Sequence, residues 1–359
     1  MFSYEQGQVT KVIEKNDYVT EIIVLVSGKE EKAINYNLLT GPVGLGDRVI
    51  LNTTAVRLNL GTGGYHFVIN NLKQIEQPIK GSGHIMKMRY TPFQIKVLSV
   101  EEATSPFHNV MSTANNLNNT PVIIGTLHSM LTPITWGIKT RSSRDLKVIC
   151  VMTDGAALPL AFSKTIPQLR KKKLIHGTIT IGNAFGGDIE AVNIYSGLLA
   201  AKHVLKADII VVTMGPGIVG TGTKWGFSGI EQGQIINAVE SLGGIPIAVP
   251  RISFVDQRQR HYGLSHHTIT VLEKIALAPA IVPLAKLYFP KLKYVLKQWK
   301  EANLGKKHFL KIIDVHKSLN ELIQTDLKVS TMGRKIHEDQ EFFATAVASG
   351  AMAVKYLIK

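Results

Sequence analysis

A glycine-rich segment at residues 214–229 has the residue types of a site that holds an anion. Glycine tolerates positive φ, so successive backbone N–H groups can turn toward one phosphate or carboxylate. Two threonine hydroxyl groups and one lysine in the same segment add donors and a positive charge. The residues that we expect to hold the anion are Gly215, Gly217, Gly220, Thr221, Gly222, Thr223 and Lys224. The alternative is a glycine-rich turn that only packs closely.

The same glycines match the dinucleotide-binding spacing Gly-x-Gly-x-x-Gly, but their context does not. A helix should open at the third glycine, whereas here the helical pattern is delayed until about Gly229. The next predicted strand leads to Arg251, where that motif requires an acidic partner for the ribose. The Gly-Lys-Ser/Thr order of a P-loop is absent as well. The segment therefore predicts a general anion site, with nicotinamide or flavin dinucleotide binding as an alternative.

Arginines and histidines are dense in residues 251–268. Arginine pairs with phosphate in a bidentate manner, and histidine moves protons near neutral pH. We expect Arg251 to bind the anion and His266 or His267 to stabilise charge or transfer a proton. The alternatives are that the arginines are simply exposed and that a histidine helps to cap a helix. Thr268 is the expected cap of the helix that follows. Because adjacent side chains point in different directions, His266 and His267 by themselves do not predict a metal pair.

Two carboxylates, Asp154 and Asp188, lie close to the ends of predicted strands. Oxygen ligands suit Mg²⁺, and a carboxylate can act as a general base. We expect Asp154 and Asp188 to hold Mg²⁺ or to act as catalytic base beside the anion. The alternative for Asp188, together with Glu190, is the capping of a helix start, where negative charge complements the helix dipole.

Serine nucleophile chemistry is not indicated by the sequence. His128 and Ser129 are neighbours, and side chains that are adjacent in sequence rarely face each other. The Gly-x-Ser-x-Gly pattern of a nucleophile elbow is absent from the chain, which argues against an α/β-hydrolase.

The segments that must position these side chains alternate between strands and helices. Short apolar runs, typical of strands buried on both faces, occur at 122–126, 148–152, 178–181, 209–213 and 245–249. Further predicted elements are helices over 157–173 (interrupted at Pro167), 190–205, 229–242 and 291–303, a strand over 309–315 and a helix from about Asp339. This spacing is typical of right-handed crossovers. It predicts a Rossmann-like, mostly parallel α/β sheet, whose carboxyl edge receives the segments described above.

The N-terminal part of the chain alternates apolar and polar residues in short runs separated by glycine-rich turns. Runs of this kind occur at 7–13, 19–26, 32–36, 48–52 and 65–69. They predict a small OB-like β-barrel, which places the domains at 1–83 (barrel), 84–120 (connector or lid over a site) and 121–359 (Rossmann-like). Residues 1–80 hold eight basic and eight acidic side chains, so the barrel carries no net charge that would favour nucleic acid.

Composition excludes several classes of protein. With 45% hydrophobic and 19% charged residues among 359, the chain is not intrinsically disordered. A single cysteine, Cys150, excludes an internal disulfide framework and a cysteine-rich metal site. The longest apolar run, near 276–285, is short and carries two prolines, and the N-terminus lacks the pattern of a signal peptide. We expect a cytoplasmic protein without a membrane partner.

The net charge of +15 is concentrated in part of the chain. Residues 286–311 hold eight lysines against Glu301 alone. Clustered lysines can follow a nucleic-acid backbone, but they also form solvated helix faces. We favour the solvated face, because no arginine is interleaved with these lysines as single-strand binding would favour.

Four phrases in the sequence resemble an uncharacterised bacterial family, which is classified as a domain of unknown function and occurs chiefly in Gram-positive lineages. They lie at 153–159, 215–223, 265–267 and 330–334. The resemblance extends over nearly the whole chain. It implies a bacterial cytosolic protein without an established activity, so no family roles transfer to individual residues.

Taken together, the residues predict a protein that binds a phosphorylated metabolite or nucleotide at the carboxyl edge of a parallel sheet. Phosphoryl transfer or hydrolysis is the reaction class expected if the protein is an enzyme, with Mg²⁺ as the cofactor to test. The alternative is a non-enzymatic nucleic-acid-binding or regulatory protein that uses the barrel and residues 286–311. A third reading is a structural homo-oligomer with a vestigial pocket.

Overall fold

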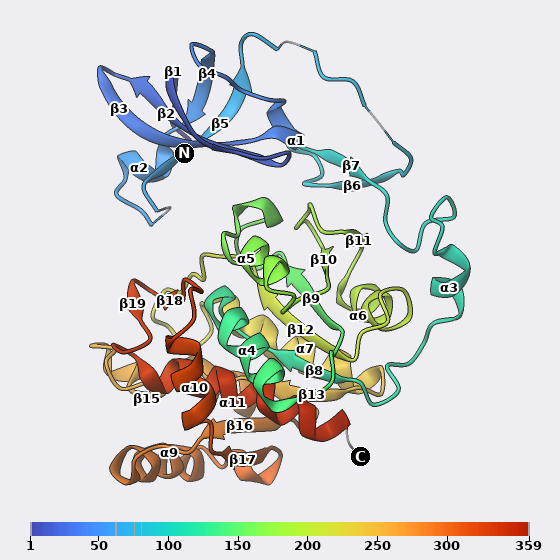
Figure 1. Cartoon of the computed structure of the whole chain (residues 1–359), viewed down its shortest axis with the longest axis vertical. Helices are drawn as coiled ribbons and strands as arrows, with labels where there is room; N and C mark the ends of the chain where they lie inside the picture. The colour runs from blue at the N-terminus through green and yellow to red at the C-terminus, as the bar shows by residue number, and fades with distance from the viewer. Residues whose placement is uncertain (1, 62, 75, 80, 358–359) are drawn as a thin grey trace. The chain divides into compact units, whose positions relative to one another are not determined.

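The computed structural model describes residues 2–61, 63–74, 76–79 and 81–357. The chain divides into two compact units, the first ending at Val97 and the second beginning at Leu98 (Figure 1). The segment predicted as a connector, 84–120, is thus shared between them. Its first part forms a hairpin of β6 (Ile85–Lys87) and β7 (Ile95–Val97) in the first unit. Its second part belongs to the second unit and contains α3 (His108–Thr113).

The first unit contains a closed barrel of five strands. These are β1 (Tyr4–Lys15), β2 (Val19–Val26), β3 (Lys29–Tyr36), β4 (Arg48–Asn52) and β5 (Tyr65–Asn71), with α1 (Asn37–Thr40) and α2 (Thr54–Arg57) in the connections. The strand order is β1-β2-β3-β5-β4, and β1 pairs with both β2 and β4 to close the barrel. Alternate β2 side chains, including Ile22 and Val24, fill the interior. The predicted OB-like barrel is confirmed.

The second unit is built on an eight-stranded sheet in which every pair is parallel. Its strands are β8 (Pro121–Ile124), β9 (Val148–Thr153), β10 (Gly177–Ile181), β11 (Ile189–Ala191), β12 (Ile209–Met214), β13 (Ile245–Ala248), β16 (Ile281–Ala285) and β17 (Phe309–Ile313). Every residue of β8, β9, β10 and β12 is buried, as a sheet covered on both faces requires. The predicted Rossmann-like sheet is confirmed.

Helices cover both faces of this sheet (Figure 1). One face carries α4 (Leu131–Arg141), α5 (Thr165–Lys171), α10 (His316–Ile323) and α11 (Gln340–Leu357). The other carries α6 (Ile194–His203), α7 (Glu231–Ser241), α8 (His266–Thr270) with the π-helical turn Val271–Ile275, and α9 (Phe289–Glu301). The two apolar layers come from side chains that alternate across each strand.

The order of the strands marks one place where ligands bind in folds of this kind. The sheet runs β11-β10-β9-β12-β8-β13-β16-β17. From β8 the chain winds toward β11, then returns to insert β12 beside β8 and winds the other way to β17. The winding direction therefore reverses at β8 and β12, and ligands bind beyond the carboxyl ends of strands at such a reversal.

Several elements of the second unit differ from the sequence expectation. The helix expected over 157–173 is only α5, which contains Pro167 in its first turn and is not interrupted there. β16 is a strand although its run contains Pro283, which lacks the N–H that a central strand uses. Its alignment with β13 is limited to one residue pair, Ile247 with Ile281. The helix expected over 190–205 begins only at Ile194, because β11 precedes it and the Asn193 side chain caps the helix.

The part of the chain that the structure describes contains no helix long and apolar enough to cross a membrane.

The helices α4 and α11 approach each other closely through two glycines. A Cβ atom at Gly137 would overlap the carbonyl oxygen of Val347, and one at Gly350 would overlap that of Ile134. Almost all of α11 is buried, so it forms the centre of one apolar layer rather than its surface. The glycines let the two helix backbones meet directly.

We expect Gly350→Ala to destabilise the second unit. In an open helix this exchange stabilises by about 1 kcal/mol. Here the methyl group meets backbone that cannot move aside, and such overpacking costs roughly 1–3 kcal/mol. Urea unfolding followed by circular dichroism measures the difference. Gly44→Ala is the control, since the nearest atom to its Cβ is Asp47 Oδ2 at 3.9 Å. A Gly350→Ala protein as stable as the wild type would contradict the packing described.

Candidate functional site

The glycine-rich segment that follows β12 folds into a small hairpin. Gly220 and Phe227 form its antiparallel bridge, and Thr221 N donates to Gly226 O at 2.7 Å. The hydroxyl oxygens of Thr221 and Thr223 lie 2.9 Å apart, and Gly226 N donates to Thr223 Oγ1 at 3.1 Å. The two hydroxyl groups expected to hold an anion therefore close the turn of the hairpin itself.

Other residues of the hairpin are open to solvent. Lys224 is exposed at its tip, with Nζ 5.6 Å from the centre of the Trp225 ring. Gly217 and Gly222 have φ of 106° and 83°, which side chains other than glycine rarely adopt. At the base, a Cβ atom on Gly215 would overlap the backbone of Ala157 in the loop after β9. These glycines fix the shape of the hairpin.

The hairpin lies against the segment that follows β13. Gly220 contacts the His267 ring, whose Cε1 would be 3.6 Å from an added Cβ. A Cβ atom added to Gly222 would likewise lie 3.5 Å from Nη2 of Arg260. Two regions that the sequence singled out separately, 215–224 and 251–268, are therefore brought together at the carboxyl edge of the sheet.

Three histidines form a cluster in this region. His261 lies in the short 3₁₀ helix Gln259–His261, while His266 and His267 are the first two residues of α8. The ring centres of His266 and His267 are 4.3 Å apart, and that of His261 lies 4.9 and 4.8 Å from them. His267 also stacks on Phe227 of the hairpin at 3.9 Å with an interplanar angle of 4°. Adjacent histidines thus do share one cluster, with His261 as the third member.

Ser265, rather than Thr268, caps α8. Its Oγ accepts a hydrogen bond from His267 N at 3.2 Å and lies 2.7 Å from His261 Nδ1. Thr268 is the third residue of the helix, and its hydroxyl accepts from Arg251 N at 2.9 Å. The cap therefore also orients one imidazole ring of the cluster.

The histidines of the cluster are neutral near pH 7. The pKa of His261 and of His267 is lowered to about 3, first by burial and then by neighbouring groups that include the positively charged Arg251. The pKa of His266 is lowered as well, first by burial and then by the guanidinium of Arg260. Neutral imidazoles keep a lone pair on one ring nitrogen, which is available to accept a hydrogen bond or to bind a metal ion.

Arg251 follows β13 and is buried, with 3% of its surface exposed. Its Nη2 donates to Asp256 Oδ2 at 3.1 Å, and Arg258 Nη2 donates to the same oxygen at 2.7 Å. Hydrogen bonds from Arg258 hold the pKa of Asp256 well below its usual range. Burial lowers the pKa of Arg251 to about 10, so the group remains charged near neutrality. Its Nε has no hydrogen-bond partner among the described residues.

A second ion pair lies beside the first. Arg334 belongs to β19 (Arg334–Lys335), which pairs with β18 (Ser330–Thr331). Its Nε donates to Asp339 Oδ2 at 3.0 Å, and Ser253 Oγ donates to the same oxygen at 2.9 Å. Ser253 lies in β14 (Ile252–Ser253), which pairs with β15 (Gly263–Leu264). The ion pair therefore ties residues near the C-terminal helix to the loop after β13.

A pair of carboxylates lies at the ends of β9 and the hairpin. Thr153 Oγ1 donates to Glu231 Oε1 at 2.6 Å, and Asp154 Oδ2 accepts from Asn183 N at 2.9 Å. Burial raises the pKa of Glu231 to about 7, and the charge of Asp154 adds to the shift. Sequence reasoning missed Glu231. Its position two residues after Gly229, where the helix that follows the hairpin begins, is the signal that could have identified it.

Asp188 does not share this site. Its Oδ2 accepts from Thr178 N at 2.8 Å and from the side chain of Arg170, near the amino end of β10. Asp154 instead binds Asn183, just beyond the carboxyl end of the same strand. Burial alone would raise the pKa of Asp188, but the bonds from Arg170 and Thr178 outweigh it and hold this pKa below its usual value. The structure therefore does not bring Asp154 and Asp188 together around one ion.

His128 forms a buried dyad with a serine that is distant in sequence. Its Nδ1 donates to Met214 O at 3.1 Å, so its Nε2 accepts from Ser163 Oγ at 2.6 Å. Ser129 instead donates to Thr331 Oγ1 at 3.0 Å. Burial lowers the pKa of His128 to about 4. Because both His128 and Ser163 are buried, the dyad joins the segments that follow β8 and β9 rather than facing a substrate, and the bond to Met214 adds the end of β12.

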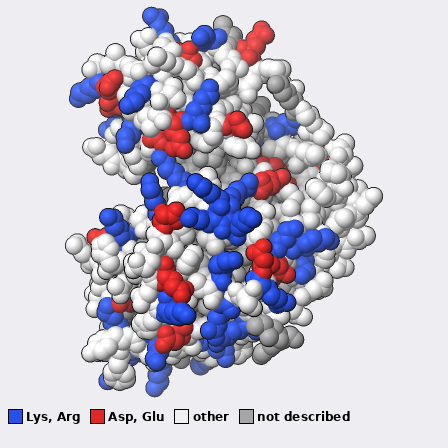
Figure 2. All heavy atoms as spheres, viewed as in Figure 1, with Lys and Arg blue, Asp and Glu red and all other residues white. Residues whose placement is uncertain are grey.

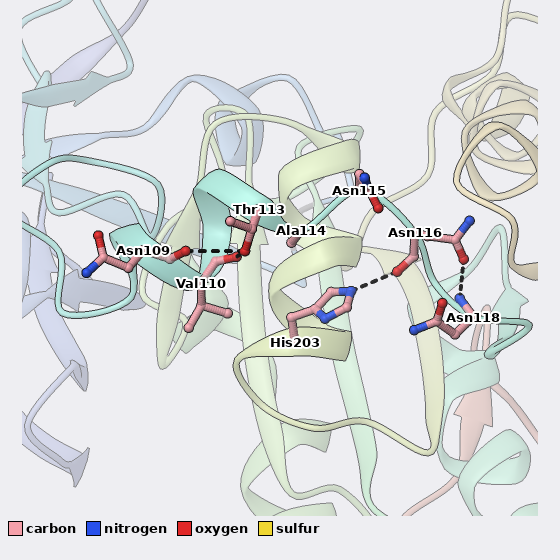
Figure 3. A pocket seen from close by; sticks show the side chains of 8 residues that line it. All are labelled: Asn109, Val110, Thr113, Ala114, Asn115, Asn116, Asn118 and His203. Carbon is pink, nitrogen blue, oxygen red and sulfur yellow. Dashed lines mark hydrogen bonds between the residues drawn. The ribbon is translucent and has the colours of Figure 1, made fainter.

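Two surface features lie away from this region. A hollow of about 400 Å³ lies between α3 and α6. Several asparagines and His203 line it (Figure 3), and the Nε2 of His203 is 2.7 Å from Asn116 O. The hollow lies toward the amino ends of the strands. The loop that lines it continues to Asn119, whose N donates to Gly243 O just before β13 begins. Figure 2 shows Lys and Arg gathered over α5. Two of these basic residues are paired, Arg170 with Asp188 and Lys172 with Asp326.

We expect the raised pKa of Glu231 to make stability depend on pH. An acid whose pKa rises on folding favours the folded state below its unfolded pKa, and this contribution is lost as pH rises toward the folded value of about 7. Glu231→Gln keeps an acceptor for Thr153 but removes the titration. The variant should exceed the wild type by a few kcal/mol in free energy of unfolding at about pH 8 and match it near pH 4.

Urea unfolding at several pH values measures this difference. Glu240→Gln, on the exposed side of the same helix, is the control and should follow the wild type throughout. Parallel pH profiles for the wild type and Glu231→Gln would show that Glu231 is not perturbed.

Comparison with known proteins places the chain in a family without an established activity. The family described as "Protein of unknown function (DUF3866)" matches residues 32–350, from the third strand of the barrel into the C-terminal helix. No curated protein matches the chain. Because the match covers most of both units, the chain belongs to the DUF3866 family.

Proposed function

We propose that this protein binds a small phosphorylated metabolite or nucleotide at the carboxyl edge of the parallel sheet, next to β13. The observation that carries the proposal is the buried guanidinium of Arg251, whose Nε lacks a partner among the described residues. A buried donor without a partner costs about 1–3 kcal/mol, and a bound anion would satisfy it.

The balance of charge around Arg251 supports an anionic ligand. Arg251 and Arg258 share the single carboxylate of Asp256, and Arg334 pairs with Asp339. Arg260, beside the hairpin, adds a fourth guanidinium group. Four guanidinium groups therefore face two carboxylates, while the histidines are neutral. Guanidinium groups bind phosphate oxygens through paired hydrogen bonds, so a phosphate group is the ligand that fits best.

The reaction that we propose at this edge is hydrolysis or phosphoryl transfer. Asp154 with Glu231, rather than with Asp188, is the carboxylate pair that supports binding of Mg²⁺ or the role of general base. With a pKa of about 7, Glu231 is partly ionised near neutrality, as an efficient general base is. The reaction is the second part of the proposal, and the proposed binding of the ligand does not depend on it.

The lysines of residues 286–311 do not support the alternative of nucleic-acid binding. Lys291 pairs with Glu341, and Lys297 lies 3.7 Å from Glu301. Lys307 donates to the carbonyl oxygen of Ala276 after the π-helical turn. Several positive charges of this segment are thus used within the fold, which favours the interpretation as a solvated helix face.

The test is a thermal-shift and calorimetric titration with AMP, ADP, ribose 5-phosphate and pyrophosphate. A ligand at 100 times its dissociation constant should stabilise the protein by about 2.7 kcal/mol. Arg260→Gln and Arg251→Lys should weaken binding at least tenfold, which is about 1.4 kcal/mol. Arg144→Gln, an exposed arginine just before β9 at the amino edge, is the matched control and should bind as the wild type does.

Two results would contradict the proposal. One is binding that Arg260→Gln and Arg251→Lys leave unchanged while both variants remain folded. The other is an absence of metabolite binding together with polynucleotide binding that falls steeply with salt, which is the behaviour of a protein that follows a phosphate backbone.

A further inference from the structure

We propose that His261, His266 and His267 together bind one divalent transition-metal ion of the Zn²⁺ type. This site is distinct from the carboxylate pair proposed for Mg²⁺, and its test does not require the anion to bind. Among the described residues, it is the one group of three or more His, Cys, Asp and Glu side chains whose potential ligand atoms converge.

The geometry of the cluster is close to that of a three-histidine metal site. Each residue offers one ring nitrogen, and the three nitrogens lie within 4.8 Å of one another. Around tetrahedral Zn²⁺, with Zn–N distances near 2.1 Å, ligand nitrogens lie about 3.4 Å apart. Small rotations of the imidazole rings would close this difference. Two of the rings come from one helix and the third from the turn before it, so the backbone already holds them together.

The hydrogen bonding of the rings leaves nitrogens for a metal ion. His266 Nε2 and His267 Nδ1 are buried and have no hydrogen-bond partner in the part of the chain that the structure describes. Such buried nitrogens are costly, and an absent ion is one of the ordinary explanations for them. When His261 donates a hydrogen bond from Nδ1–H to Ser265 Oγ, the Nε2 atom of His261 carries the lone pair that a metal ion needs. The serine then acts as the outer partner that orients the ligand.

The surrounding charges favour the state of the rings that binds metal. A metal ion competes with protons for imidazole nitrogens, so a site that stays unprotonated near pH 7 binds without that competition. Burial and the positive charge of Arg251 lower the pKa of each of the three histidines, which works in the same direction as the geometry. The positive charge of the arginines opposes the binding of a cation. Asp256 neutralises part of the charge of Arg251 and Arg258, and Asp339 pairs with Arg334.

The ligand set indicates the class of metal and what it would do. Three neutral imidazoles suit Zn²⁺, Co²⁺ or Ni²⁺ rather than Mg²⁺, which prefers oxygen ligands. Three protein ligands also leave one tetrahedral position open, as catalytic zinc sites do. If the proposed anion site is correct, an oxygen atom of the bound phosphate could take that position beside Arg260. The metal site would then serve the same ligand as the arginines.

The experiment uses the full-length protein after treatment with a chelator and gel filtration. Titration with Co²⁺ is followed by its visible absorption, which is intense for tetrahedral nitrogen ligation, and titration with Zn²⁺ by calorimetry. We expect one ion per chain, a rise in the unfolding temperature with Zn²⁺, and no competition from millimolar Mg²⁺. His261→Gln and His266→Gln should each weaken binding at least tenfold.

His203→Gln is the matched control, because His203 is a histidine of the amino-edge hollow and should not affect the metal. Circular dichroism of each metal-free variant shows whether it is folded. Failure of the chelator-treated wild type to bind Zn²⁺ or Co²⁺ saturably would overturn the proposal, and this result does not depend on any variant. Unchanged affinity in folded His261→Gln and His266→Gln would overturn it as well. Neither result alters the outcome of the metabolite titrations, which are performed without these metals.

Discussion

The candidate site depends on keeping one positive charge inside the protein. Arg251 is buried at the end of β13, where an unpaired guanidinium would be very unfavourable. Asp256 offsets this cost and also binds Arg258, which turns the chain back over the strand end. The hydroxyl group of Ser253 donates a hydrogen bond to Asp339, next to the C-terminal helix. The backbone of Arg251 in turn bonds to the start of α8, because its N donates to Thr268 Oγ1 and its O accepts from Ser265 N beside the adjacent histidines.

The sheet and the edge that carries the candidate site could be predicted from sequence because both follow from local patterns. Strands buried on both faces are short and mostly apolar, and glycine or aspartate follows several of them at once, as Gly125, Asp154 and Gly215 do. The glycine-rich hairpin, Arg251 and the two adjacent histidines do lie at that edge. The barrel was equally clear, since its alternating runs end at glycine-rich turns.

The pairing of side chains could not be predicted, because it depends on distances that spacing does not contain. Asp154 and Asp188 flank the same strand but lie toward opposite ends of it, and a parallel sheet separates those ends completely. His261 joins the other histidines only because the turn before α8 folds back on Ser265. Glu231 becomes unusual through burial against Thr153, a strand residue far away in the chain.

The contact between α4 and α11 joins the helix that follows the first strand of the sheet to the C-terminal helix. During synthesis, β8 and α4 leave the ribosome about two hundred residues before α11, so one apolar surface of the sheet lacks its central helix for all of that time. Loop closure over such a separation is entropically costly and slow. The barrel, whose strands are near neighbours in sequence, has no such delay. The nascent chain should therefore need protection from aggregation mainly while its second unit awaits completion.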